Sequence, residues 1–157
     1  MTSLWQKGLS LIEVMIALAV FSFGLLALAA LMASGLKYNT SALHRSYATS
    51  QAYDMADRMR ANRQGLDDRV YNSLSGNSTV PDCGRFGSDS VINCDSGEMA
   101  QYDVSDWNNA NADLLPEGTG TVSLKSSDPD IYTITISWND DRDPDTAPDS
   151  FIVEFQP

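Results

Sequence analysis

Residues 7–13 of this chain read KGLSLIE, and residues 14–36 continue as VMIALAVFSFGLLALAALMASGL. The second stretch is 23 residues long and contains neither a charged residue nor a proline. As an α-helix it would be roughly 35 Å long, which is enough to cross the apolar core of a bilayer. The sequence therefore predicts a membrane-spanning helix close to the start of the chain.

Glu13 is the only charged residue between Lys7 and Lys37. A carboxylate within the hydrocarbon of a membrane costs about 2.5–3.5 kcal/mol, so such a residue needs a partner. If the chain were cut after Gly8, the new amine of Leu9 would lie one helical turn from Glu13. A short basic leader, a glycine at the cut and a glutamate soon after it resemble the leader signal of type IV pilins.

Two other interpretations of the N-terminal region fit less well. A cleaved secretory signal has an apolar core of about 7–15 residues before small residues at its cut site. Residues 33–35, ASG, could imitate such a site, but the apolar core before them is too long. A plain membrane anchor explains the length of the span but not Glu13. Because the flanking charges barely distinguish the two ends, we take the orientation from the leader and expect a periplasmic C-terminal domain.

Composition limits what the rest of the chain can do. Of the 157 residues, those beyond the span are enough for one small domain with a modest core. Residues 37–69 carry six Lys and Arg against four Asp and Glu, whereas residues 82–157 carry three against sixteen. Direct binding of nucleic acid by the acidic half is not expected, since phosphate binding needs clusters of Lys and Arg. An acidic surface instead keeps an exposed domain soluble or meets a basic or metal partner.

The helical pattern continues beyond the span, because no proline occurs before Pro81. Four apolar residues recur at spacings of four, three and four: Ala48, Ala52, Met55 and Met59. This narrow stripe predicts an amphipathic helix over residues 37–63, packed against a sheet or a neighbouring helix. We expect Gly65 to stop that helix. Two pairs place an acid before a base in the favourable order, Asp54 with Arg58 and Asp57 with Arg60.

Residues 121–157 show the alternation that is typical of half-buried strands. In residues 132–138 four large apolar side chains alternate with threonine and serine; residues 151–155 repeat the pattern and residues 121–124 form a shorter third segment. We expect an α+β fold in which an antiparallel sheet of three or four strands covers the amphipathic helix. Residues 65–120 are expected to form a loop region, and Trp107 and Trp138 to lie in the core.

Cys83 and Cys94 are the only two cysteines of the chain. An even pair in an exported domain predicts a disulfide, because the periplasm is oxidising. Closing a loop of this length contributes just under ~3 kcal/mol in the chain-entropy model. A metal site with two thiols and no nearby histidine is the weaker interpretation.

Three aspartates before the last expected strand have the 1-3-5 spacing that opens a calcium loop: Asp141, Asp143 and Asp145. They are a weak calcium candidate, because Thr146 stands where that loop needs glycine and Ile152 where it needs glutamate. A solvated acidic loop is the favoured interpretation. His44, the only histidine, has no partnered serine or cysteine in the sequence pattern and is expected at the surface. We therefore predict neither an enzyme nor a cofactor site.

The leader, the long helix and the terminal sheet together resemble a type IV pilin. Residues 46–62, SYATSQAYDMADRMRAN, are similar to the segment just outside the membrane in minor pilins of the type IV pilus modification protein V family. The strand at 132–138 followed by Asn-Asp-Asp also resembles that family. The resemblance covers residues 7–63 well, 131–155 moderately and 65–125 barely.

The resemblance implies a leader of residues 1–8, a transmembrane and assembly half of the helix over 9–36, and a periplasmic head over 37–157. A prepilin peptidase would cleave between Gly8 and Leu9 and methylate the amine of Leu9. In the assembled fibre, Glu13 would form a salt bridge with the N-terminal amine of an adjacent subunit. Leu9 stands where the family more often has phenylalanine, a change that the peptidase should tolerate.

The function implied by the resemblance is that of a minor pilin that primes or modifies type IV pilus assembly. It would lie in the pilus tip complex and support adhesion and twitching motility. Its implied partners are the prepilin peptidase, other minor pilins, the major pilin and a large tip adhesin. The chain would reside in the bacterial inner membrane and in the assembled pilus on the cell surface. Two alternatives remain: a tip pseudopilin of a type II secretion system, and a simple membrane-anchored periplasmic binding or sensor module.

Overall fold

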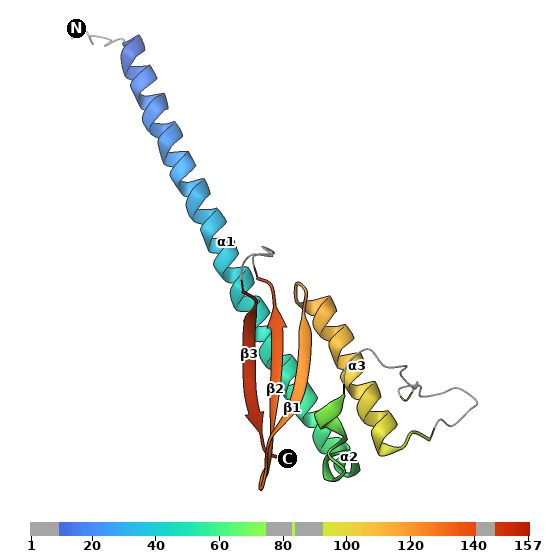
Figure 1. The fold of residues 1–157 in the computed structure, drawn as a ribbon. Helices are drawn as coiled ribbons and strands as arrows, with labels where there is room; N and C mark the ends of the chain where they lie inside the picture. Colours follow the sequence, from blue (N-terminus) through green and yellow to red (C-terminus); the bar gives the residue numbers. More distant parts are fainter. Residues whose placement is uncertain (1–9, 75–82, 84–92, 141–146) are drawn as a thin grey trace, which may run out of the picture. The chain divides into compact units, whose positions relative to one another are not determined.

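The computed structural model of the chain describes residues 10–74, 83, 93–140 and 147–157 (Figure 1). The chain divides into two units, the first ending at Thr40 and the second running from Ser41 to Pro157. The elements in chain order are α1 (Leu11–Ala61), α2 (Arg63–Asp67), the 3₁₀ helix η1 (Val70–Ser73), α3 (Ser96–Leu114), β1 (Thr119–Ser127), β2 (Asp130–Trp138) and β3 (Asp149–Phe155).

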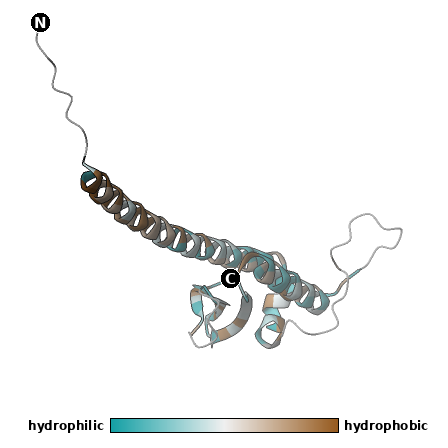
Figure 2. Cartoon of the chain, turned by 90° about the horizontal axis from the view of Figure 1, so that it is seen from above, coloured by the Kyte–Doolittle hydropathy of each residue, from teal (hydrophilic) through white to brown (hydrophobic). Residues whose placement is uncertain are grey.

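The first unit consists of the N-terminal part of α1. Every described side chain of this unit is exposed, including the large apolar ones. Two of its hydroxyls donate to carbonyls of the same helix, Ser22 to Leu18 at 2.7 Å and Thr40 to Leu36 at 3.0 Å. By length and composition α1 contains a segment that can cross a membrane, as the sequence predicts. Figure 2 shows this apolar character along the N-terminal part of the helix.

The second unit begins with the C-terminal part of α1, whose apolar stripe forms one wall of the core. All four predicted stripe residues are fully buried: Ala48, Ala52, Met55 and Met59. The two predicted surface ion pairs also form, with Asp54 and Arg58 at 2.8 Å and Asp57 and Arg60 at 2.9 Å. The amphipathic pattern of the sequence therefore predicted correctly which face of the helix packs inward.

The sheet of the second unit is antiparallel, with the strand order β1-β2-β3. The central strand β2 supplies most of its core, since Tyr132, Ile134 and Ile136 are fully buried. The intervening residues of β2 face outward, where Thr135 lies between Thr121 of β1 and Ile152 of β3. The predicted α+β fold with a three-stranded sheet and the buried positions of Trp107 and Trp138 are confirmed.

The expectation of a loop region over residues 65–120 is wrong, because α3 occupies nineteen residues of it. Asp95 caps this helix by accepting a hydrogen bond from the Glu98 amide, while the Glu98 side chain accepts one from the Asp95 amide. Buried residues recur along one face of α3 at helical spacing: Ala100, Val104, Trp107 and Asn111. The capping box at residues 95–98 was the sequence signal that could have revealed the helix.

Gly65 is not the stop that the sequence suggested. The long helix ends at Ala61, and Gly65 lies within the short helix α2. Asn62 makes the break, with a backbone φ of −95° and ψ of 67°, and its side-chain oxygen accepts a hydrogen bond from the Gly65 amide at 3.1 Å. The amide nitrogen of the same side chain donates to the Ser96 carbonyl at 2.8 Å and so connects the end of α1 to the start of α3.

Candidate functional site

The first candidate site is the N-terminal turn of α1, which contains Glu13. The side chain of Glu13 is exposed, and its backbone amide donates to the Ser10 carbonyl at 3.0 Å. A carboxylate is favoured in the first turn of a helix, because the unpaired amides there carry partial positive charge. No ion pair joins Glu13 to any residue that the structure describes. Gly8 and Leu9, the expected cut site, lie outside the described residues.

Apart from Ser10, the described residues next to Glu13 on the helix are apolar. Its neighbours Ile12, Val14 and Met15 are 65%, 44% and 62% exposed. A helix that is apolar all round is suited to lipid or to a bundle of similar helices rather than to water. Within either environment a carboxylate needs a cation to offset its desolvation. The arrangement can therefore select a partner that brings a positive charge to this turn.

The second candidate site is a cluster of charges where α1 and α3 meet in the second unit. Arg58 of α1 pairs with Asp54 at 2.8 Å and with Asp106 of α3 at 2.8 Å, and lies 3.8 Å from Asp103. Burial lowers the pKa of Arg58, but hydrogen bonds to Asp106 and Asp54 more than reverse this, and the pKa is raised overall. Arg58 thus joins the two helices as a permanent cation.

Asp103 is the most buried acid of this cluster, with 7% of its surface exposed. Burial raises its pKa above the ordinary value, although the hydrogen bond from the Tyr71 hydroxyl and the charge of Arg58 oppose that rise. The Tyr71 hydroxyl donates to Asp103 at 2.8 Å, and burial together with the Asp103 charge raises the pKa of Tyr71. This pair therefore holds a neutral phenol against the carboxyl group in the interior.

A cleft of about 650 Å³ opens beside this cluster, between the end of α1, α2 and the start of α3. Arg58, Asn62, Met99 and Asp103 contribute to its walls. Arg58 and the nearby acids are engaged with one another through ion pairs. Among the residues that the structure describes, no group of three or more metal-binding side chains comes together.

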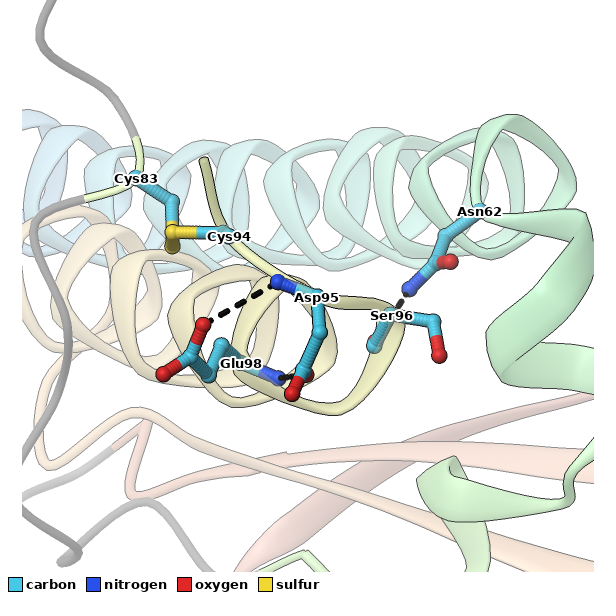
Figure 3. Close-up of a disulfide and its surroundings, with 6 residues drawn as sticks. All are labelled: Asn62, Cys83, Cys94, Asp95, Ser96 and Glu98. Atoms are coloured by element: carbon cyan, nitrogen blue, oxygen red, sulfur yellow. Dashed lines mark hydrogen bonds between the residues drawn. A yellow bond between two sulfur atoms is a disulfide. The ribbon is translucent and has the colours of Figure 1, made fainter. Parts of the chain in front are cut away.

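The disulfide between Cys83 and Cys94 forms as predicted (Figure 3). Its Cα atoms lie 5.9 Å apart, and Cys94 directly precedes Asp95, the cap of α3. Because Asn62 binds the first turn of α3 through the Ser96 carbonyl, the disulfide, the cap and the end of α1 form one connected group. The bond therefore has a structural role: it fixes the chain that leads into α3.

His44 does not lie at the surface, although the sequence suggested that it would. Its side chain is only 12% exposed, and its Nδ1 atom lies 2.5 Å from a carboxylate oxygen of Asp140. Burial alone would raise the pKa of Asp140, but hydrogen bonds from Ser41 and His44 lower it below the ordinary value. The pair joins α1 to the end of β2. The three calcium candidates, Asp141, Asp143 and Asp145, lie outside the described residues.

Both candidate sites contain residues of segments that match known protein families. Residues 6–29 match the prokaryotic N-terminal methylation motif, and residues 30–105 match the family described as Type IV pilin Tt1218. This chain is a type IV prepilin-like protein. The two matches adjoin and extend from the leader through α1 and into α3. Searches of curated proteins and of solved structures give no match.

These matches support three general properties of the chain: its processing, its anchoring and its structural role. The methylation motif implies processing by a prepilin peptidase, and the apolar N-terminal helix of this class indicates anchoring in a membrane or a pilus. Pilins are structural proteins and are generally not enzymes. The long helix packed against a three-stranded antiparallel sheet is a pilin-like α+β fold.

Proposed function

We propose that this pilin is a minor pilin that primes or modifies type IV pilus assembly, within the tip complex, and supports adhesion and twitching motility. One observation carries the proposal: the methylation motif leads into an exposed apolar helix whose first turn holds a single carboxylate, Glu13. A subunit of this kind can be stored in a membrane and then transferred into a bundle of similar helices.

The processing step acts on the expected cut site. The peptidase hydrolyses the bond between Gly8 and Leu9, which releases residues 1–8. It then transfers a methyl group from a sulfonium methyl donor to the new amine of Leu9, which loses a proton. A glycine before the cut lets the peptidase approach the backbone closely, because it has no side chain. Cleavage creates a positive charge in a part of the chain that is otherwise apolar, one turn from Glu13.

In the fibre, Glu13 pairs with the N-terminal amine of an adjacent subunit. An unpaired charge in the apolar centre of the bundle would be strongly unfavourable, so this pair sets the register in which a subunit is added. The assignment to minor pilins rests on residues 46–62, which resemble that class and which supply the core stripe together with Asp54 and Arg58 of the charge cluster. The major pilin, other minor pilins and a large tip adhesin are the proposed partners, in the inner membrane and on the cell surface.

The mass of the intact protein tests the processing step. We expect chain extracted from membranes of peptidase-positive cells to begin at Leu9 and to carry one extra methyl group. In cells that lack the peptidase, residues 1–8 should remain attached. A species that keeps residues 1–8 in peptidase-positive cells would contradict the proposal.

The assembly role is tested by removing the protein from cells and counting surface pili. A minor pilin that primes assembly should be needed for normal numbers of pili while being a small fraction of their subunits. Normal piliation with loss of protein secretion would instead favour the tip pseudopilin of a type II secretion system. No effect on either would favour a simple membrane-anchored binding or sensor module.

A further inference from the structure

The two edges of the sheet differ in how their backbone groups are satisfied. At the outer edge of β1, the Gly120 amide donates to the side-chain oxygen of Asn108 at 2.7 Å. The Leu124 amide donates to the side-chain oxygen of Asn72 at 2.8 Å. Two asparagines, from α3 and η1, therefore occupy donors that another strand would need. A register shift after Leu124 further disturbs this edge.

The register shows which groups of β3 face away from the sheet. Gly120 directs its amide outward, so it forms a non-hydrogen-bonded pair with Ile136 opposite it. Ile136 then directs its own backbone groups toward β3 and pairs with Phe151. Because this direction alternates along a strand, three residues of β3 point their N–H and C=O groups out of the sheet: Ser150, Ile152 and Glu154. No described residue binds these groups.

Edge strands of stable monomers are commonly protected by charges, prolines or bulges. β3 contains no lysine, arginine or proline, and its pairing with β2 has no register shift. Its two acids form ion pairs within this chain, Asp149 with Arg45 at 3.5 Å and Glu154 with Lys125 at 2.6 Å. Between them residues 150–153 are uncharged, and Ile152 is 58% exposed.

We propose that the open edge of β3 binds an extended strand of a neighbouring pilus subunit, which continues the sheet beyond β3. An extended backbone is the occupant that fits, because the free groups recur at every second residue of a strand. The added strand is uncharged along its centre, since charges at both ends of β3 are paired within this chain. Its inward side chains are apolar and extend the core next to Phe151 and Val153, which are half buried. Figure 1 shows β3 at the edge away from α3, where this strand would lie. The proposal rests on the assembly function above.

Hydrogen exchange of the full-length protein tests this. The amides of Ser150, Ile152 and Glu154 are compared in three samples: purified chain in detergent, cell membranes and sheared surface fibres. We expect exchange at these amides to be about tenfold or more slower in fibres or membranes than in detergent. Exchange at Phe151 and Val153, which already bond to β2, should change much less. Equal rates at the three outward amides in all samples would overturn the proposal.

Two variants separate the edge from the rest of the strand. Ile152→Pro removes an outward amide and obstructs an incoming strand, but it leaves the bonds to β2, because proline is tolerated on the open side of an edge strand. Ile152→Thr keeps the amide and serves as the matched control. We expect the slowed exchange at Ser150 and Glu154 to disappear in the proline variant and to persist in the threonine variant. Slowed exchange that survives Ile152→Pro would also overturn the proposal.

The outcomes distinguish this proposal from the assembly function. If the protein is absent from fibres but its edge is protected in membranes, the result counts against assembly and for a strand partner. If the protein is present in fibres with an unprotected edge, assembly stands and the strand partner is wrong. The comparison in the unmodified protein decides the matter even if the proline variant fails to fold.

Discussion

The two halves of α1 are parts of one helix but are built for different surroundings. In residues 11–36 the apolar residues cover the whole circumference and all are exposed. In residues 48–59 all of them except Tyr53 form a stripe that is buried against the sheet. The first half has a single charge, Glu13, whereas the second half is rich in ion pairs such as Asp54 with Arg58. One continuous helix can therefore lie partly in an apolar environment and partly in a folded domain, and the distribution of its apolar residues determines which part lies where. Four sets of substitutions test this difference.

The largest effect is expected at Glu13. Glu13→Gln should still be inserted and processed, but surface pili should fall at least about tenfold, because breaking a buried ion pair costs about 3–5 kcal/mol. Counting pili by electron microscopy and measuring co-purification of partner pilins test this. Ser22→Ala, a polar change at an exposed site of the same half, is the matched control. Normal piliation and co-purification in Glu13→Gln would show that the carboxylate has no pairing role.

Two methionines of the same helix compare the halves directly. Met55 is fully buried and Met32 is 69% exposed. Met55→Ala should lower the free energy of unfolding of the second unit by about 2–5 kcal/mol, since it leaves a cavity in the core. Met32→Ala should change it by less than about 0.5 kcal/mol. Denaturant unfolding of the full-length chain in detergent, followed by tryptophan fluorescence, measures both. Similar losses in the two variants would contradict the assignment of the core to one half only.

Removing the disulfide should loosen the start of α3 more than it loosens α1. The double variant Cys83→Ser with Cys94→Ser should lose just under ~3 kcal/mol of stability, because an eleven-residue separation closes a short loop. Hydrogen exchange should accelerate in the first turn of α3, around Ser96 and Glu98, more than at Met55. Equal acceleration in both places would mean that the bond stabilises the whole unit rather than the entry to α3. Quantitative alkylation of both thiols in unreduced periplasmic protein would rule the bond out.

The smallest effect is expected for the pair of His44 and Asp140, at the start of the second unit. Asp140 has a pKa below its ordinary value of 3.8, so it binds fewer protons in the folded state than in the unfolded state. Its contribution is therefore complete above about pH 4 and is lost as the pH falls through the lowered folded pKa. Asp140→Asn should cost about 1–2 kcal/mol at pH 7 and progressively less in acid.

Thermal unfolding across this pH range, with the exposed Asp113→Asn as a control, provides the measurement. A loss for Asp140→Asn that stays constant into strong acid would show that the ion pair does not account for it.

The contribution of Asp103 to stability depends on pH in the opposite direction, because burial raises its pKa. Protonation of Asp103 favours the folded state, and that contribution is lost as the pH rises through the raised folded pKa.

Periodic patterns accounted for much of the fold. The stripe of Ala48, Ala52, Met55 and Met59 and the alternation from Tyr132 to Trp138 predicted buried faces that the structure confirms. Helix α3 escaped prediction because its core residues are few and separated by polar ones. Asp103 and Asn111 are among its buried positions, and a pattern of apolar residues does not reveal polar residues that become buried through tertiary contacts. The prediction that the helix ends at Gly65 was wrong for a related reason. The helix ends before Asn62, whose side chain bonds to groups elsewhere in the chain.

The sequence by itself determined the features that depend on local pattern: the apolar length of the first half of α1, the place of its one carboxylate, the buried faces of helix and strands, and the pairing of the only two cysteines. The tertiary structure alone decided which distant polar groups meet. It brought Asp103 and Asp106 to Arg58, brought Asp140 to His44, and placed two asparagine side chains against the outer edge of β1. Buried apolar residues recur at the regular spacing of a helix or a strand, and this spacing can be recognised in the sequence. A hydrogen bond or ion pair needs two groups within a few ångströms, and only the folded chain sets that distance.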